Sequence, residues 1–134
     1  MADEIRVAIL TDADVVTARQ QARTMGASLG FSSTDLTLLA TAISEVARNI
    51  TTYAGTGVVT LRTVRERERE GIEVVASDEG PGIENVELAM QDGYSTRNGL
   101  GLGLPGTRRL VDDFELDTRP GVGTTVRLVK WSRA

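Results

Sequence analysis

A carboxylate and a carboxamide four residues apart are the first side chains in this sequence that could do chemistry together. Glu45 and Asn49 lie in the segment Ser-Glu-Val-Ala-Arg-Asn at residues 44–49, and residues four apart share one face of a helix. An Asn oxygen is a suitable ligand for Mg²⁺, and a Glu can orient or deprotonate a nearby hydroxyl. The same pair also fits an exposed helix flank joined by a hydrogen bond.

Two glycine-rich segments and one threonine are the other candidates. Residues 78–82 read Asp-Glu-Gly-Pro-Gly after an apolar strand pattern, so the carboxylate could accept a hydrogen bond from a ligand while glycine lets a flat ring approach. Residues 99–104 read Gly-Leu-Gly-Leu-Gly-Leu before a helix pattern, where free backbone N–H groups can hold phosphate. Thr124 follows a Gly-Val-Gly turn. Taken singly, the first segment also fits a tight turn with a helix cap, and the turn before Thr124 a simple hairpin.

The composition removes several classes of chemistry. The chain has no cysteine and no histidine, and Lys130 is the single lysine among 15 basic residues. A structural zinc site, a thiol or imidazole nucleophile, a Ser-His-Asp triad and histidine phosphotransfer are therefore excluded. The Walker A lysine is excluded as well. Any catalytic base must be a carboxylate.

The length and charge indicate one domain, spanning residues 1–134, with no nucleic acid as partner. A net charge of -4 argues against nucleic-acid binding, which needs a concentrated basic face. No apolar stretch approaches the length of a membrane span, and the N-terminus lacks the pattern of a signal peptide. We therefore expect a cytoplasmic protein without a membrane partner.

The hydrophobic pattern predicts an α/β (α+β) fold. Alternation predicts strands over residues 4–10, 58–64, 72–77, 114–118 and 124–131. Apolar spacing of three and four, with caps and glycine stops, predicts helices over residues 12–30, 33–50, about 85–91, and 106–113. This order predicts a two-layer sandwich whose mixed, mostly antiparallel sheet is covered by helices on one face. The alternating charges of residues 65–71 indicate solvated strand ends and a loop, with partner docking as the alternative.

In this order and spacing, the four motifs resemble the nucleotide-binding fold shared by gyrase, Hsp90, histidine kinases and the mismatch-repair ATPases (the GHKL, or Bergerat-type, fold). Residues 45–49 look like its N box, 78–82 and 99–103 like its two glycine boxes, and Thr124 like the threonine of its last strand pair. The resemblance covers nearly the whole chain. The chain is too short for the extra domains of three of these groups, and it lacks the phospho-acceptor histidine of the fourth.

The short serine kinases of bacterial partner-switching systems remain. Residues 44–50, 53–55, 93–96 and 130–131 resemble the RsbT-type switch kinases of the stressosome. The sister group of anti-sigma-factor kinases usually has a histidine soon after the N-box asparagine, whereas residues 50–53 here read Ile-Thr-Thr-Tyr. That difference favours the switch kinases.

This resemblance implies ATP as substrate and Mg²⁺ as cofactor, with Glu45 as the base and Asn49 as the Mg²⁺ ligand. It implies a nucleotide site made by Asn49, Arg48, Asp78, Gly80, Gly82, Gly99, Gly101, Leu102, Gly103 and Thr124. In it, Asp78 would accept the adenine amino group and the glycine-rich amides would hold phosphate oxygens. Positive charge near the γ-phosphate would come from Mg²⁺ or from one of Arg48, Arg97 and Arg108.

The resemblance also implies the partners. The family phosphorylates serines or threonines of STAS-domain scaffold proteins and then binds an output protein, typically a PP2C-type phosphatase; the helix around residues 15–25 is one possible docking face. Two alternatives are an anti-sigma factor with kinase activity and a non-catalytic ATP-sensing module. We expect a lid over residues 93–104 that is mobile without nucleotide.

Overall fold

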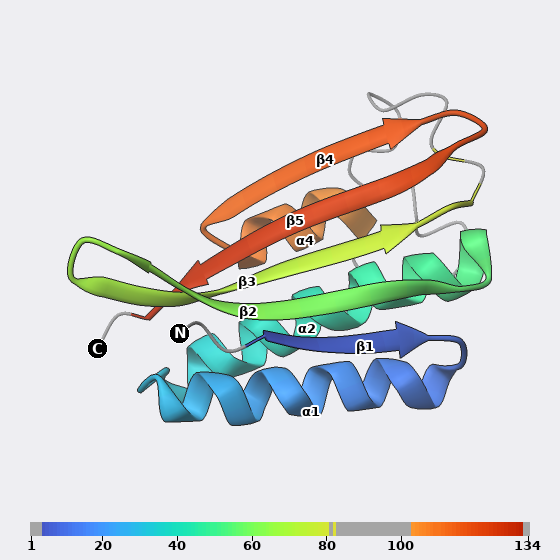
Figure 1. Cartoon of the computed structure of the whole chain (residues 1–134). Helices are drawn as coiled ribbons and strands as arrows, with labels where there is room; N and C mark the ends of the chain where they lie inside the picture. The colour runs from blue at the N-terminus through green and yellow to red at the C-terminus, as the bar shows by residue number, and fades with distance from the viewer. Residues whose placement is uncertain (1–3, 81, 83–102, 133–134) are drawn as a thin grey trace.

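Helices and strands form two layers, with the helices on one side of a single sheet (Figure 1). The computed structural model describes residues 4–80, 82 and 103–132. The strands are β1 (Glu4–Ile9), β2 (Gly57–Glu66), β3 (Arg69–Asp78), β4 (Asp113–Arg119) and β5 (Gly123–Trp131). The helices are α1 (Asp12–Ser28), α2 (Ser33–Asn49), the short π-helix η1 (Ile50–Ala54) and α4 (Gly103–Leu110). The predicted two-layer sandwich is confirmed.

The sheet has the strand order β1-β2-β3-β5-β4, and each pair of neighbours is antiparallel. Predominantly antiparallel pairing is confirmed, but the parallel pair expected of a mixed sheet is absent from the described strands. The reason lies in the connections. Short turns join β2 to β3 and β4 to β5, and two antiparallel helices return the chain from β1 to the same end of the sheet.

The predicted helix starts are confirmed by their caps. Thr11 and Asp14 form a capping box at α1, where Leu10 and Thr11 donate backbone hydrogen bonds of 2.8 and 3.0 Å to Asp14 Oδ2. Ser32 caps α2, because its hydroxyl accepts from the Asp35 amide at 3.1 Å. Such caps give hydrogen-bond partners to backbone N–H groups at the helix start, which have none within the helix.

The last helix differs from its prediction. We expected residues 106–113, whereas α4 spans Gly103–Leu110. The helix ends earlier because the next residues bond to β5: the Asp112 amide donates to the Val129 carbonyl at 2.9 Å, and the Asp112 carboxylate accepts from the Trp131 amide at 2.7 Å. Asp113 is therefore already the first residue of β4.

The core lies between the sheet and the helices. Every second residue of the central strands points into it, so Leu61, Val74 and Leu128 are fully buried. From the other layer, Leu39 and Ile43 of α2 are fully buried as well. The apolar residues that recur every second position in the strands therefore pack against those that recur every three or four positions in α2. Burial of this apolar surface is the main source of stability for a domain of this size.

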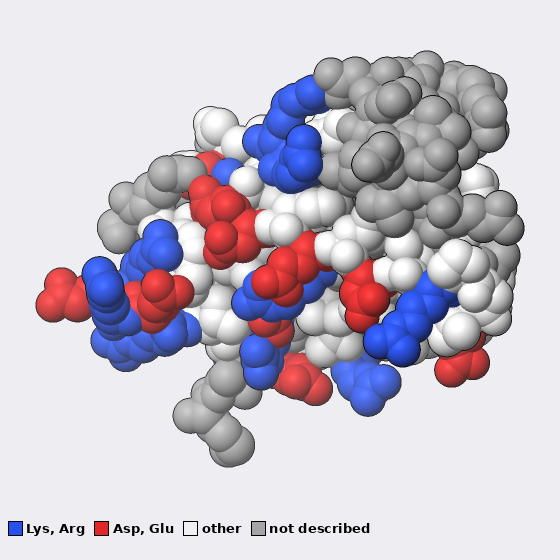
Figure 2. All heavy atoms as spheres, turned by 90° about the horizontal axis from the view of Figure 1, so that it is seen from above, with Lys and Arg blue, Asp and Glu red and all other residues white. Residues whose placement is uncertain are grey.

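The outer face of the sheet is polar and has a row of ion pairs across four strands. Glu73 on β3 accepts a hydrogen bond from Arg127 on β5 at 2.7 Å and lies 2.8 Å from the Arg62 guanidinium on β2. Arg127 also lies 3.7 Å from Glu115 on β4. Bonding to Glu73 raises the pKa of Arg127 above its ordinary value. Figure 2 shows acidic and basic side chains interspersed on this side of the molecule.

The charged run between β2 and β3 is mostly strand. The strands extend to Glu66 and from Arg69, so that only two residues form the turn, and Arg67 there has a φ of 57°. Residues 65–70 are exposed, as the solvated interpretation predicts. The strands are longer than predicted because Glu66 and Arg69 pair across the ladder and Arg69 stacks over Trp131 at 4.2 Å.

The single lysine is a buried connection between three elements. Lys130 on β5 donates to the Leu110 carbonyl at the end of α4 at 3.0 Å, and its ammonium lies 3.7 Å from the Asp35 carboxylate at the start of α2. Both side chains are less than 10% exposed. Lys130 therefore fixes the two helices to the last strand and is not a free surface charge.

The predicted helix at about residues 85–91 and most of the predicted lid at residues 93–104 lie outside the described residues, which resume at Gly103. Within the described ranges, no helix is both long and apolar enough to cross a membrane.

Candidate functional site

Glu45 and Asn49 lie in the last turns of α2, at the edge of its apolar face. The Glu45 side chain is only 5% exposed, and Arg48 on the next turn donates to its Oε1 at 3.1 Å. Asn49 is half-buried. The interpretation of these residues as an exposed helix flank therefore does not fit Glu45, because an almost fully buried carboxylate is rare unless it is paired or functional.

The chain changes its helical geometry directly after Asn49. Residues 50–54 form η1, in which the Gly55 amide donates to the Ile50 carbonyl at 2.8 Å. Gly55 ends the turn with a φ of 89°, a conformation that glycine adopts without cost. Single π-turns are frequent at functional sites. The sequence does predict the stop at residues 55–57 but has no recognisable signal for the wider turn.

Asp78 is the last residue of β3, and its neighbours on both sides belong to the candidate site. It lies opposite Gly57 on β2 and opposite Thr124 on β5. The Gly80 amide donates to Asp78 Oδ1 at 2.9 Å, which holds the half-buried carboxylate at the strand end. The predicted Asp and Thr therefore meet in direct register.

Two close contacts bring the end of α2 against the end of β3. A Cβ on Gly57 would lie 2.8 Å from Ile50 Cγ2 and 3.2 Å from Asp78 Cβ. A Cβ on Gly80 would lie 2.6 Å from Ala54 Cβ. Only glycine fits at either position, so η1 packs directly onto the loop that begins at Asp78. The first and second motifs therefore share one edge of the fold.

The hairpin between β4 and β5 closes the same edge. Gly82 has a φ of +74°, and a Cβ there would overlap the Arg119 carbonyl oxygen. Gly123 approaches the Asp78 carbonyl in the same way. Beside it, the hydroxyls of Thr118 and Thr124 lie 2.9 Å apart. Thr118 is a site neighbour that sequence reasoning missed, because its partner follows only from the register of the hairpin.

The donor set fits a metal ion held mainly by a ligand. Within the described residues, no group of three or more His, Cys, Asp or Glu could form a protein cage. Mg²⁺ in phosphate sites typically keeps several waters and takes one or two protein ligands besides the phosphates. Asn49, a half-buried residue one helical turn from Glu45, is compatible with that role.

The structure thus pairs Glu45 with Arg48 on α2, sets Asp78 opposite Thr124, and packs η1, which directly follows Asn49, on Gly80. Gly82 lies against the hairpin between β4 and β5. Of the predicted phosphate-binding residues, Gly103 is the first residue of α4, whereas Gly99, Gly101 and Leu102 lie outside the described residues. Arg97 lies there as well, and Arg108 is exposed on α4.

Comparisons with known proteins agree with this arrangement. The family model for the histidine kinase-like ATPase domain matches residues 10–130. The serine/threonine-protein kinase RsbT of Bacillus subtilis is 45% identical over 133 residues, which is 99% of this chain and 100% of that protein. The anti-sigma F factor of Caldanaerobacter subterraneus is 37% identical over 97 residues, covering 68% of this chain and 66% of that protein.

A solved structure shows the same fold. The RsbU and RsbW domains of a Mycobacterium tuberculosis protein superpose with a TM-score of 0.65 at 20% identity, over 100% of this chain and 33% of that one. The chain therefore belongs to the histidine kinase-like ATPase domain family and, within it, to the serine/threonine protein kinases of the RsbT type.

Proposed function

We propose that this chain transfers the γ-phosphate of ATP to a serine or threonine hydroxyl of a STAS-domain protein of the stressosome. The observation that supports this most is the shared edge at which η1 packs on Gly80 and Asp78 faces Thr124. We infer that the buried carboxylate on α2 and the candidate adenine acceptor on β3 belong to one site. The match to a serine/threonine kinase over nearly its whole length supports the same reaction.

In this proposal, Asp78 accepts a hydrogen bond from the adenine amino group. Its Oδ1 is already held by the Gly80 amide, so the carboxylate is oriented before ATP arrives. Gly82 leaves room for the ring, and Thr124 supports the same side from β5. The backbone amides of Gly99, Gly101, Leu102 and Gly103 are proposed to hold the phosphates, since closely spaced glycine amides before a helix attract anions.

Asn49 is proposed to ligate Mg²⁺. When bound, the ion would neutralise phosphate charge, which together with positioning provides most of the rate in phosphoryl transfer. Arg97 and Arg108 are the proposed sources of additional positive charge near the γ-phosphate; Arg48, the third candidate from the sequence, donates to Glu45 instead and is not given this role. Lys130 is excluded from this role because it is buried against Asp35 and Leu110.

Glu45 is proposed as the base. As the bond between the substrate oxygen and the γ-phosphorus forms, the bond from that phosphorus to the β-phosphate oxygen breaks and ADP leaves. The hydroxyl proton moves to the Glu45 carboxylate. A carboxylate suffices because the transition state for this transfer is loose and demands little of the base.

After transfer, we propose that the chain acts as a partner switch in the cytoplasm: it leaves the phosphorylated STAS protein and binds an output protein, such as a PP2C-type phosphatase. A second candidate is an anti-sigma factor that also phosphorylates its antagonist. Similarity to the anti-sigma F factor supports it. That similarity covers a smaller share of the chain than the similarity to the kinase.

One affinity experiment distinguishes these functions. The tagged chain is incubated with lysate of its source organism, with and without ATP and Mg²⁺. The captured proteins and their phosphorylated residues are then identified by mass spectrometry. The proposal predicts a STAS-domain protein with an ATP-dependent phosphoserine or phosphothreonine, and a phosphatase captured once that protein is released. Capture of a sigma factor supports the second candidate, and ATP-independent capture without phosphorylation contradicts both kinase functions.

A further inference from the structure

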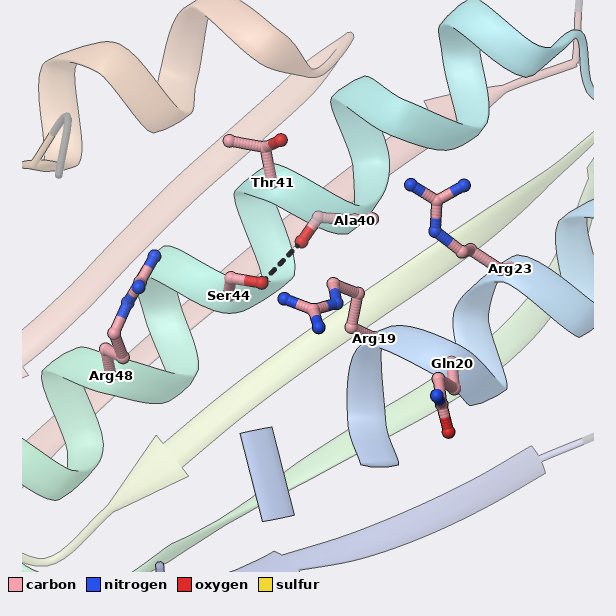
Figure 3. A pocket seen from close by; sticks show the side chains of 7 residues that line it. All are labelled: Arg19, Gln20, Arg23, Ala40, Thr41, Ser44 and Arg48. Atoms are coloured by element: carbon pink, nitrogen blue, oxygen red, sulfur yellow. Dashed lines mark hydrogen bonds between the residues drawn. The ribbon is translucent and has the colours of Figure 1, made fainter. Parts of the chain in front are cut away.

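A groove lies between α1 and α2 (Figure 3). Its volume is about 460 Å³. Arg19 and Arg23 extend into it from α1, and Thr41, Ser44 and Arg48 line it from α2 (Figure 3). Gln20 and Ala40 complete the lining. The groove therefore combines three guanidinium groups with two hydroxyls.

The charge of this groove is opposite to that of the chain. None of the described residues that line it is a carboxylate, although the whole chain has a net charge of -4. Among the described residues, neither Arg19 nor Arg23 forms an ion pair. The Ser44 hydroxyl donates to the Ala40 carbonyl at 2.9 Å. It is neutral and adds no negative charge to the groove. Guanidinium groups bind carboxylates with paired, directional hydrogen bonds.

Arg48 lines this groove and also contacts the proposed catalytic carboxylate, Glu45. Its guanidinium donates to Glu45 Oε1 at 3.1 Å, and its side chain is 44% exposed whereas that of Glu45 is 5% exposed. Arg48 is the partner that can move away, because the Glu45 side chain is almost fully buried. A half-exposed ion pair is weak enough to exchange partners.

We propose that Arg48 is a positioning residue that couples this groove to Glu45: an acidic segment of a protein partner docks on Arg19 and Arg23, takes over Arg48, and leaves the Glu45 oxygen open to accept a proton. The inference rests on the proposed role of Glu45 as base. An acidic peptide is favoured over nucleic acid because the groove is compact and the chain as a whole has a negative net charge. Nucleic acid needs an extended basic surface. Docking would then activate the site only when a partner is present.

The docking step is tested by the binding of a fluorescein-labelled octaglutamate peptide to the full chain, followed by anisotropy. We expect the double substitution Arg19→Ala/Arg23→Ala to weaken binding at least about fivefold. Arg6→Ala, which removes an exposed arginine from β1, should leave it unchanged. Equal binding by the double variant and the unaltered chain would overturn the docking site.

The coupling step is tested by the hydrolysis of saturating ATP with Mg²⁺, in which water replaces the protein hydroxyl. We expect octaglutamate to raise phosphate release by the unaltered chain about two- to fivefold, the range that an exposed ion pair of this kind permits. Arg48→Ala should show the raised rate without peptide and no response to it. Arg48→Lys should restore the response, because an ammonium can pair with Glu45.

A lower or unchanged rate in Arg48→Ala would overturn the coupling. Failure of the underlying function gives a different result: if Glu45→Ala hydrolyses ATP as fast as the unaltered chain, the base is wrong. The peptide-binding measurement still decides on the groove in that event, since it needs no catalysis.

Discussion

Asp78 on β3 and Thr124 on β5 lie directly opposite each other at one end of the strands, and Asp78 also lies opposite Gly57 on β2. The end of β3 therefore lies between the starts of β2 and β5, and η1 packs there on the loop after Asp78. This convergence brings residues from distant parts of the sequence to the same end of the sheet. The account of the site depends on it.

Asp78→Asn should weaken ATP binding. The amide keeps an oxygen that can accept from Gly80, as Asp78 Oδ1 does at 2.9 Å, but it loses the negative charge that strengthens the bond from the adenine amino group. Hydrogen bonds to charged groups are worth about 1.5–3 kcal/mol, so the dissociation constant should rise at least about tenfold.

Isothermal titration with ATP measures this change. Asp117→Asn is the control, since it removes an exposed carboxylate from β4 without touching the edge. An unchanged affinity in Asp78→Asn would remove Asp78 from the adenine site.

Gly82→Ala and Gly121→Ala form a matched pair. Both glycines have positive φ, +74° and +78°, so alanine is strained at either position by about 1 kcal/mol. At Gly121 a new Cβ would meet nothing within 4 Å, whereas at Gly82 it would overlap the Arg119 carbonyl. We expect both substitutions to lower the urea midpoint, and only Gly82→Ala to lower ATP affinity as well. Equal ATP affinity in the two variants would contradict the close packing of Gly82 on the hairpin.

Lys130→Met should destabilise the fold without acting on the nucleotide. It would remove the ammonium that lies 3.7 Å from the buried Asp35 carboxylate and the donor to the Leu110 carbonyl. Removing one partner of a buried pair costs about 3 kcal/mol. Chemical denaturation measures the loss, and the double variant Asp35→Asn/Lys130→Met should recover part of it. If Lys130→Met unfolds at the same urea concentration as the unaltered chain, the pair does not fix the helices.

The capping box of α1 should make stability depend on pH. Backbone hydrogen bonds from Leu10 and Thr11 hold the pKa of Asp14 below its ordinary value. Because the folded pKa is the lower one, the bonds stabilise the fold above the unfolded pKa, and this contribution is lost as the pH falls through the folded pKa.

Asp14→Ala should therefore lower the melting temperature at neutral pH, and the difference should shrink in acid. Asp12→Ala, which removes another first-turn carboxylate of the same helix, is the control for the helix dipole. A difference that stays constant with pH would show that the Asp14 charge is not what stabilises the cap.

Much of this arrangement could be predicted from local pattern. Alternation at residues 58–64 and 72–77 indicates strands because one face of each is buried, and Ser32 marks the start of α2 because its hydroxyl satisfies a first-turn amide. Glu45, Asn49, Asp78 and Thr124 were predictable as candidates because their types and order suit nucleotide chemistry.

Features that depend on the approach of distant elements could not be predicted. The π-turn at Ile50 follows from the packing of η1 on Gly80, and the Asp35 partner of Lys130 follows from how α2 meets β5. No spacing rule links residues so far apart. The end of α4 was misplaced for the same reason, because the Asp112 bonds to β5 decide it.

The central claim is that Glu45 activates a protein hydroxyl for attack on ATP. A single-turnover experiment with γ-³²P-ATP, Mg²⁺ and the captured STAS-domain protein compares the unaltered chain with Glu45→Gln, which keeps the shape of the side chain and removes its charge. The account predicts that Glu45→Gln binds ATP with unchanged affinity and transfers label at least about a hundredfold more slowly, as expected for loss of a general base. Transfer at an unchanged rate, with ATP bound normally, would contradict it.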